Sequence, residues 1–276
     1  MKFGELGKRV AVGIIGIPLI FTVTLIGEIY FLLLVNIILT LSLWEFYGLA
    51  EKKGFYPLKI FGILSTLIIS WDLYFYQGKS LEFILFFILF LNLIFELFKG
   101  KSHSLVNAAV TFFGIGYISL FSSFILIREL PSNLGAPNRV GGWLVLFIFL
   151  IIWICDTAAY LWGYRFGKHP LFLRVSPKKT WEGAIAGFVV GTASAFGLRY
   201  LLIPSISMVD SIVIGTIVGI LGQTSDLVES LYKRDSGVKD SSKILPGHGG
   251  ILDRFDSPLL VGPFIYLYFI LTGIPF

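Results

Sequence analysis

The stretch GWLVLFIFLIIWICDTAAYLWGY, residues 142–164, decides the fold class. A transmembrane helix takes about 20 predominantly apolar residues, and this run carries a single charged residue, Asp156. The strands of a membrane β-barrel alternate apolar and polar residues, so an uninterrupted run of this kind excludes a large barrel. Residues 142–164 are therefore predicted to cross a membrane as a helix.

Similar runs follow one another along the whole chain. The protein has 276 residues, of which 56% are hydrophobic and 14% are charged, and its mean hydropathy is +0.85. Soluble proteins carry about 25% charged residues, and the single cysteine, Cys155, excludes a disulfide framework or a cysteine-rich zinc site. We predict an all-α polytopic integral membrane protein with about nine transmembrane helices. The predicted spans are 10–26, 28–49, 57–76, 81–98, 105–127, 142–164, 180–203, 208–232 and 251–275.

The spans divide into two parts. Residues 1–140 hold about five spans, and residues 141–276 hold about four spans together with the two longest loops, 165–179 and 233–250. Polar residues concentrate in the second part, which we therefore expect to be the catalytic domain. The first run lacks a small-x-small cleavage site, so we expect a retained helix and not a secretory signal.

Basic residues set the expected orientation. With nine spans, 18 of the 22 Lys and Arg residues lie on the side of the N-terminus, and only Lys79, Arg128, Arg139 and Arg199 lie on the other side. The positive-inside rule then predicts a multi-pass protein of the cell (inner) membrane with a cytoplasmic N-terminus. This bias and attraction to anionic lipids explain the net charge of +5, and no motif indicates a nucleic-acid partner.

Carboxylates gather near the cytoplasmic ends of four predicted spans. At about 1.5 Å per residue, Asp156 lies about 12 Å and Asp226 about 9 Å from the end of its span. Glu182, Asp253 and Asp256 lie roughly 3 to 8 Å in by the same arithmetic. Charges inside a membrane are costly, so these groups are expected to pair with nearby Lys and Arg residues or to bind cations.

The spacing of the carboxylates favours a bound cation. Asp226 and Glu229 are three residues apart, as are Asp253 and Asp256, so each pair is expected to face one side of its helix. Paired carboxylates suit Mg²⁺, a hard ion that prefers oxygen ligands and often accompanies phosphates. Three other carboxylates are interpreted as interfacial groups or as partners of nearby lysines: Glu45, Asp72 and Glu96.

Two polar motifs border these carboxylates. Residues 176–183, SPKKTWEG, place a Ser-Pro turn and paired lysines before a predicted helix start, where free backbone N–H groups favour an anion. Residues 246–250, PGHGG, contain three glycines that let the backbone approach a ligand closely. Together with the basic residues of the loop 233–250, this motif indicates a site for a polyphosphate and its metal.

The glycine motif belongs to a longer stretch, residues 230–256, that resembles a known family. Its parts are SLYKR at 230–234, KD at 239–240 and LPGHGGILDRFD at 245–256. They resemble the signature of the phosphatidate cytidylyltransferases, also called CDP-diacylglycerol synthases, with a Tyr at position 232 where an aliphatic residue or Phe is expected. A second stretch, from DTAAY at 156–160 to SPKKTWEG, also resembles this family, whereas residues 1–140 match it mainly as apolar spans.

The resemblance implies a polytopic enzyme that joins CTP to phosphatidic acid, forming CDP-diacylglycerol and pyrophosphate, with Mg²⁺ required. It also implies a homodimer and a second, monovalent cation such as K⁺. The metal ligands expected on this basis are Asp156, Asp226, Glu229, Asp253 and Asp256. The expected catalytic residues are Asp226, Lys233, Arg234, Lys239, Asp240, His248, Asp253, Arg254 and Asp256. The expected substrate-binding residues are Ser176, Lys178, Lys179, Thr180, Glu182, Gly249 and Gly250.

Two other classes of protein remain open. Intramembrane carboxylates also line cation paths in transporters and channels, but here they cluster near one face and leave no continuous path. A related CTP-using lipid enzyme, a polyprenol kinase or an archaeal-lipid cytidylyltransferase, would share the nucleotide and metal chemistry. Incubation with CTP and phosphatidic acid separates these classes by their products.

Overall fold

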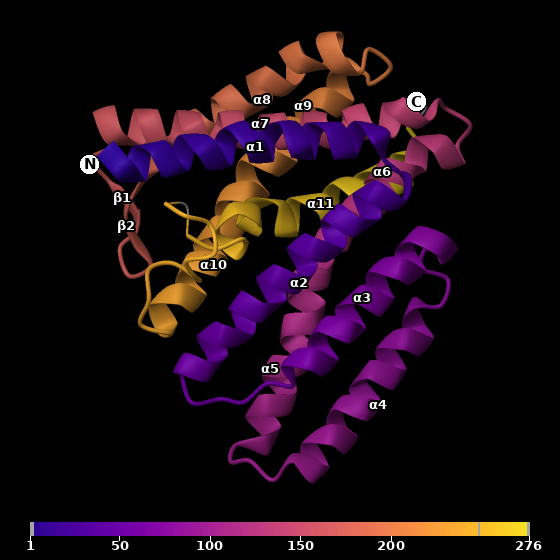
Figure 1. Cartoon of the computed structure of the whole chain (residues 1–276). Coiled ribbons are helices and arrows are strands. Elements are labelled where there is room, and N and C mark those ends of the chain that lie inside the picture. The colour runs from indigo at the N-terminus through magenta and orange to yellow at the C-terminus, as the bar shows by residue number, and fades with distance from the viewer. Residues whose placement is uncertain (1–2, 248, 275–276) are drawn as a thin grey trace. The chain divides into compact units, whose positions relative to one another are not determined.

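Figure 1 shows the computed structural model, which describes residues 3–247 and 249–274, with residues 3–12 described as backbone only. The helices are α1 (Phe3–Ile26), α2 (Glu28–Lys52), α3 (Lys59–Tyr76), α4 (Leu81–Lys99), α5 (Ser104–Ser119), α6 (Ser123–Asn133), α7 (Asn138–Phe166), α8 (Trp181–Leu202), α9 (Met208–Ile217), α10 (Gln223–Asp235) and α11 (Leu252–Thr272). Two short strands are β1 (Pro170–Phe172) and β2 (Ser176–Thr180). A 3-10 turn, η1 (Leu120–Ser122), joins α5 to α6, and a π-helical turn, η2 (Val218–Gly222), joins α9 to α10.

The predicted apolar runs fall on helices throughout the described part of the chain. There, seven continuous helical stretches are long and apolar enough to cross a membrane. They are Glu28–Lys52, Leu81–Lys99, Ser104–Asn133, Asn138–Phe166, Trp181–Leu202, Met208–Asp235 and Leu252–Thr272. The apolar part of α1, Gly13–Ile26, is shorter, and α3 is not among the seven. The prediction of an all-α polytopic membrane protein is confirmed, and the number of nine spans stays a prediction.

The chain forms two compact units, and each unit takes segments from both sides of residue 140. Unit 1 comprises the described residues up to 23 together with 28–126 and 232–255. Unit 2 comprises residues 24–27, 127–231 and the described residues from 256 onward. Helices α2 to α5 therefore belong to unit 1, and α7, α8 and α9 belong to unit 2.

Small residues let the helices of unit 1 approach each other. Tyr47 of α2 lies against Gly62 of α3 and Gly114 of α5, and a Cβ atom on Gly114 would lie 2.5 Å from the Tyr47 ring. The Tyr47 hydroxyl donates a hydrogen bond of 2.7 Å to the carbonyl oxygen of Thr111 on α5. Lipid tails are as apolar as the helices, so close packing and hydrogen bonds of this kind hold membrane helices together.

The surface of α4 is apolar where it is exposed. Phe83, Phe86, Phe87 and Phe90 are all more than half exposed. On the buried side of the helix, the Asn92 amide donates a hydrogen bond of 2.9 Å to the Ala108 carbonyl oxygen of α5. An apolar exposed face and a polar contact toward a neighbouring helix are typical of a helix that faces lipid.

Glycines at four-residue intervals set the packing of α8 against α7 in unit 2. A Cβ atom on Gly183 would lie 2.6 Å from the Ala159 carbonyl oxygen, and one on Gly187 would lie 2.9 Å from the Cys155 carbonyl oxygen. Gly191 continues the series against the Cys155 side chain. The two backbones approach as closely as in small-xxx-small pairs of membrane helices, which only small residues permit.

Residues 176–180 form strand β2, so the Ser-Pro turn expected there is wrong. The strand pairs antiparallel with β1, with Phe172 opposite Ser176 and Pro170 opposite Thr180. Pro177 fits a strand here because both strands of a two-stranded sheet are edge strands. The helix expected at this point is confirmed, since α8 begins at Trp181 directly after the strand.

Candidate active site

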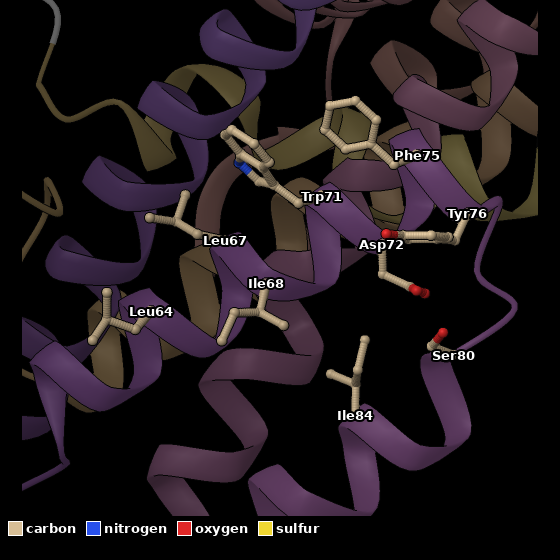
Figure 2. A pocket seen from close by; sticks show the side chains of 9 residues that line it. All are labelled: Leu64, Leu67, Ile68, Trp71, Asp72, Phe75, Tyr76, Ser80 and Ile84. Carbon is tan, nitrogen blue, oxygen red and sulfur yellow. The ribbon is translucent and has the colours of Figure 1, made fainter.

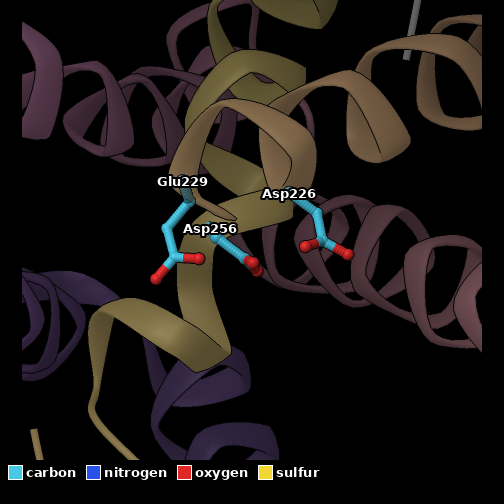
Figure 3. A group of neighbouring side chains, drawn as sticks. All are labelled: Asp226, Glu229 and Asp256. Atoms are coloured by element: carbon cyan, nitrogen blue, oxygen red, sulfur yellow. The ribbon is translucent and has the colours of Figure 1, made fainter. Parts of the chain in front are cut away.

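Three carboxylates of unit 2 form a compact group. Asp226 and Glu229 lie on α10 and Asp256 lies on α11, and one oxygen of each lies within 4.8 Å of those of the other two. Glu229 and Asp256 are buried and Asp226 is half-buried. Figure 3 shows the three carboxylates side by side, with Asp256 drawn between the other two. We call these three residues the carboxylate group.

A widened helical turn precedes the two carboxylates of α10. The π-helical turn η2 ends at Gly222, and the side chain of the next residue, Gln223, bridges it to α8. Gln223 Nε2 donates to the carbonyl oxygens of Gly219 at 2.7 Å and Ala184 at 3.0 Å. Because a π turn contains an extra residue, it rotates the helix that follows, and such turns are frequent at functional sites.

A hydrogen bond within unit 2 ties the two helices of the group together. Ser225 Oγ, next to Asp226, donates to the backbone carbonyl oxygen of Asp256 at 2.6 Å. A Cβ atom on Gly222 would lie only 3.8 Å from the Ser257 Cβ atom, so the backbones are close at this point. The carboxylates are therefore held by the helical backbone and not by a loose loop.

Positive charge near the group comes from the β-hairpin. Lys179 Nζ forms an ion pair with Asp226 Oδ2, so for Asp226 the first of the two expected compensations, a nearby lysine, is observed. Asp156 of α7 also interacts electrostatically with Asp226 and Lys179, and its side chain is exposed. Oxygen ligands gathered in this way can also bind a cation.

The donor set of the carboxylate group fits a divalent cation. Its three carboxylates offer hard oxygen ligands from two helices, and one oxygen of each lies within 4.8 Å of the others. Ligands of an octahedral Mg²⁺ lie about 3 Å apart when adjacent and about 4.2 Å apart when opposite, so the side chains would have to close by up to about 2 Å to bind one ion together. The predicted ligands Asp226, Glu229 and Asp256 are thus brought together by the fold.

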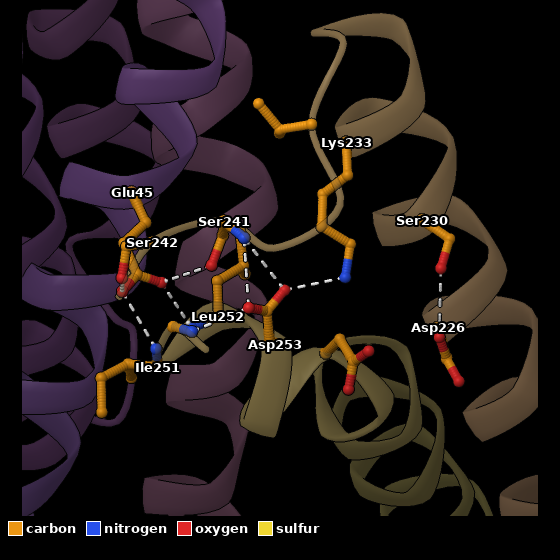
Figure 4. Close-up of polar contacts among 12 residues, drawn as sticks. Glu45, Asp226, Ser230, Lys233, Ser241, Ser242, Ile251, Leu252 and Asp253 are labelled. Atoms are coloured by element: carbon orange, nitrogen blue, oxygen red, sulfur yellow. Dashed lines mark hydrogen bonds and ion pairs between the residues drawn. The ribbon is translucent and has the colours of Figure 1, made fainter. Parts of the chain in front are cut away.

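Asp253 belongs to unit 1 and has different partners. Lys233 Nζ lies 2.7 Å from Asp253 Oδ1, while Asp253 Oδ2 accepts the backbone N–H of Ser241 at 3.1 Å and that of Gly250 at 2.7 Å. Figure 4 shows the contacts of Asp253 with Lys233 and Ser241. The backbone of Phe255 is non-helical, with φ −118° and ψ 15°. The expectation that Asp253 and Asp256 face one side of a regular helix is therefore wrong.

Glu45 of α2 is a second buried carboxylate in unit 1, with an exposed fraction of 3%. Its oxygens accept hydrogen bonds from Ser241 Oγ and Ser242 Oγ, and from the backbone N–H groups of Ile251 and Leu252. Figure 4 shows all four contacts. The interpretation of Glu45 as an interfacial group or lysine partner is therefore wrong. For Glu96 it is confirmed, since Lys99 Nζ lies 3.3 Å from Glu96 Oε2.

The remaining residues of the 233–256 stretch lie mostly at the surface. Arg234 donates to the Val238 carbonyl oxygen at 3.0 Å. Gly249 has φ +84°, and a Cβ atom there would lie 2.5 Å from Asp253 Oδ2, so this position requires glycine. His248 lies outside the described residues. Four of the predicted catalytic residues have exposed side chains: Arg234, Lys239, Asp240 and Arg254.

The predicted substrate residues of unit 2 lie along the hairpin and the start of α8. Thr180 caps α8, since its hydroxyl oxygen accepts the Gly183 N–H at 3.2 Å. Glu182 accepts the backbone N–H groups of Lys168 and His169 and lies 2.6 Å from His169 Nδ1, so it ties the hairpin to α8. Of the remaining three residues, Lys179 pairs with Asp226, Lys178 is exposed and Ser176 is half-buried.

A cavity of about 640 Å³ in unit 1 differs from these sites in its lining. Figure 2 shows it between α3 and the start of α4, with Asp72 as its one charged residue, Ser80 beside it and otherwise aliphatic and aromatic side chains. It has no lysine or arginine in its lining and does not suit a triphosphate. Asp72 itself is 4% exposed.

The fold and the carboxylate group together define a polytopic membrane protein with a candidate site for a divalent cation. The chain belongs to the Cytidylyltransferase family, whose pattern matches residues 7–272. It is similar to proteins named phosphatidate cytidylyltransferase from Staphylococcus saprophyticus and Staphylococcus aureus, each 36% identical over 181 residues. The protein of that name from Staphylococcus epidermidis is 35% identical over 183 residues.

These alignments cover part of each protein. They span 66% of this chain, 66% of the first two relatives and 67% of the third. The chain thus spans about two thirds of the length of these curated relatives. The resemblance seen in residues 230–256 is confirmed at the level of the family.

Proposed function

We propose that this protein transfers the CMP group of CTP to phosphatidic acid, forming CDP-diacylglycerol and releasing pyrophosphate. The carboxylate group carries the proposal, because Asp256 ends the stretch that resembles the family signature, Asp226 and Glu229 come directly before that stretch, and the three together have the donors for a metal. The name shared by the staphylococcal relatives supports the choice of substrate. A polyprenol kinase would use the same chemistry on another acceptor.

The proposed cofactor is Mg²⁺, held by the carboxylate group, with Asp156 beside it through its electrostatic interaction with Asp226. A bound Mg²⁺ would neutralise phosphate charge and orient the triphosphate. Lys179, which pairs with Asp226, would then be released toward a substrate phosphate. We also propose a homodimer and a second, monovalent cation such as K⁺, on the family resemblance alone.

Basic residues of the loop 233–250 and its flanks are proposed to hold the triphosphate and stabilise the leaving pyrophosphate. Arg234, Lys239 and Arg254 present exposed side chains. Lys233, whose Nζ lies 2.7 Å from Asp253 Oδ1, would exchange this contact for a phosphate when CTP binds. Lys178 and Lys179 are proposed to bind the phosphatidate head group or CTP.

The reaction needs positioning more than proton transfer. A phosphate oxygen of phosphatidic acid attacks the α-phosphorus of CTP in line, and the bond from that phosphorus to the pyrophosphate oxygen breaks. The attacking phosphate is already an anion at neutral pH, so a strong general base is unnecessary. Alignment of the two anions and neutralisation of their charge then account for most of the rate, as in other phosphoryl transfers. We propose that the site faces the cytoplasm, which supplies CTP.

Two isotope positions test the proposal with the purified full-length protein. CTP labelled at the α-phosphorus is incubated with phosphatidic acid and Mg²⁺ in mixed micelles, in parallel with CTP labelled at the γ-phosphorus. We expect α-label in the lipid product, γ-label in pyrophosphate and one pyrophosphate per CDP-lipid. Reactions without phosphatidic acid, or with diacylglycerol in its place, serve as controls.

The products also identify the alternatives. Transfer of the γ-label to a lipid would indicate a kinase and contradict the proposal. Absence of labelled lipid with either nucleotide, for protein that is monodisperse and folded, would also contradict it.

A further inference from the structure

Glu45 lies far from the signature stretch in sequence, on α2, yet it contacts that stretch directly within unit 1. The contact joins residues 196 positions apart in the sequence, so no local sequence pattern predicts it. Glu45 is almost completely buried, and its polar contacts in the described residues are hydrogen bonds from the loop and from the start of α11. A buried carboxylate in the membrane-spanning part of a protein requires such compensation.

The four donors to Glu45 lie at the two ends of one loop. Ser242 Oγ and the Ile251 N–H donate to Oε1 at 2.5 and 3.0 Å, and Ser241 Oγ and the Leu252 N–H donate to Oε2 at 2.9 and 2.8 Å. Residues 243–250 lie between these ends and contain the PGHGG motif. One side chain therefore closes the loop and also satisfies backbone N–H groups at the start of α11. We call the described residues of this segment, 241–247 and 249–252, the signature loop.

Asp253, the residue that directly follows the signature loop, also contacts it. The backbone N–H of Ser241 donates to Asp253, while the hydroxyl of the same residue donates to Glu45. The N–H of Gly250 donates to Asp253 at 2.7 Å, and a Cβ atom on Gly250 would collide with Ser241 Oγ and Glu45 Oε2. Ser241 is thus hydrogen-bonded to both carboxylates. Gly250 is hydrogen-bonded to Asp253 and packs against Glu45.

We propose that Glu45 is a positioning residue that sets the conformation of the signature loop for binding the triphosphate of CTP. It acts through Ser241, Ser242 and the start of α11 and touches no reacting atom. Its role in catalysis rests on the proposed cytidylyltransferase function, whereas its hold on the loop does not.

Glu45→Gln provides the test, because glutamine has nearly the same shape but replaces one acceptor oxygen with an NH₂ group that can only donate. Loss of a charged acceptor facing four donors should loosen the loop. We expect the KM for CTP to rise about tenfold or more, while the KM for phosphatidic acid changes less than about twofold. The matched control is Glu96→Gln, a carboxylate of unit 1 with a similar exposed fraction, 5%, whose partners Lys99 and Asn107 lie outside the loop.

A second readout does not need activity. Lys243 is exposed within the signature loop and is followed by Ile244, which is 45% exposed, so trypsin can cleave between them when the loop opens. We expect cleavage after Lys243 to be about tenfold faster in Glu45→Gln than in the wild type and unchanged in Glu96→Gln.

The two readouts separate the two hypotheses. Wild-type cleavage after Lys243 in Glu45→Gln overturns the positioning role, whether or not the protein makes CDP-lipid. Faster cleavage with equal changes in both KM values, or with a fall in kcat alone, contradicts a role in CTP binding. An inactive wild type combined with faster cleavage in Glu45→Gln contradicts only the cytidylyltransferase function.

Discussion

Carboxylates of the same kind serve different purposes in this protein because their partners differ. The oxygens of Glu45 accept four hydrogen bonds. Asp253 forms an ion pair with Lys233 and accepts hydrogen bonds from two backbone N–H groups. Asp226, Glu229 and Asp256 differ in that one oxygen of each lies within 4.8 Å of those of the other two, and a bound cation would offset the repulsion between their charges. At the scale of single residues, this proximity is the basis of the proposed metal-binding role.

Asp256→Asn tests the metal-binding role. The change removes one negative charge from the carboxylate group, so we expect Mg²⁺-dependent formation of CDP-diacylglycerol to fall by about 100-fold or more. Binding of Mn²⁺, followed by its electron paramagnetic resonance signal, should weaken in parallel. Asp210→Asn is the matched control, since Asp210 also belongs to unit 2 but bonds to Ser207 and Tyr268. Equal Mn²⁺ affinity in both variants and the wild type would show that Asp256 does not bind the metal.

The sequence predicts the carboxylate group but not the Glu45 contact. Asp226 and Glu229 are three residues apart on one helix, and this spacing holds because α10 is regular there. The same spacing fails for Asp253 and Asp256, because the non-helical backbone of Phe255 interrupts α11 three residues before Pro258. A proline in a helix lacks an N–H donor and clashes with the carbonyl group four residues earlier, so the turn before it is easily deformed.

At the scale of elements, small residues in the sequence predict the close packing of α8 on α7. The local sequence does not predict the β-hairpin. Gly183, Gly187 and Gly191 recur at four-residue intervals, and each faces α7. Residues 176–180 contain Ser, Pro and two Lys, which individually favour turns or exposure. Their strand depends on pairing with residues 170–172, and such pairing is not visible in the local composition.

Gly187→Leu tests this helix packing. The added side chain would meet the Cys155 carbonyl oxygen and the Ala159 side chain, each 2.9 Å from the first added atom, and overpacking costs about 1–3 kcal/mol. We expect the unfolding temperature in detergent to fall by about 5 °C or more. The buried thiol of Cys155, the single cysteine of the chain, should also react faster with a maleimide dye.

Gly197→Leu is the control on the same helix. Apart from the neighbouring residues and backbone of α8 itself, no atom in the described part of the chain lies within 4 Å of a Cβ atom at this position, so the variant should melt and react like the wild type. Equal melting of the two leucine variants would show that the α7–α8 contact does not depend on glycine.

At the scale of the whole molecule, the order of the spans in sequence does not give the compact units. Unit 1 takes residues 232–255 from the second half of the chain, and unit 2 takes residues 24–27 and 127–140 from the first. Hydropathy identifies which segments are helical, because each must satisfy its backbone internally in lipid. It carries no information on which helix meets which, because that depends on contacts such as Glu45 with Ser241.

Membrane sidedness is the property of the whole chain that the sequence predicts and that labelling can test. The 18 to 4 distribution of Lys and Arg residues places the loop at Lys101 in the cytoplasm and the turn at Ser205 outside. Single cysteines at these exposed positions, introduced as Lys101→Cys and Ser205→Cys in a Cys155→Ala background, provide matched reporters. In intact spheroplasts a membrane-impermeant maleimide should label Ser205→Cys alone, and in permeabilised ones it should label both. Labelling of Lys101→Cys in intact spheroplasts would reverse the predicted orientation and place the basic loops, and with them the proposed CTP site, on the side of the membrane that lacks CTP.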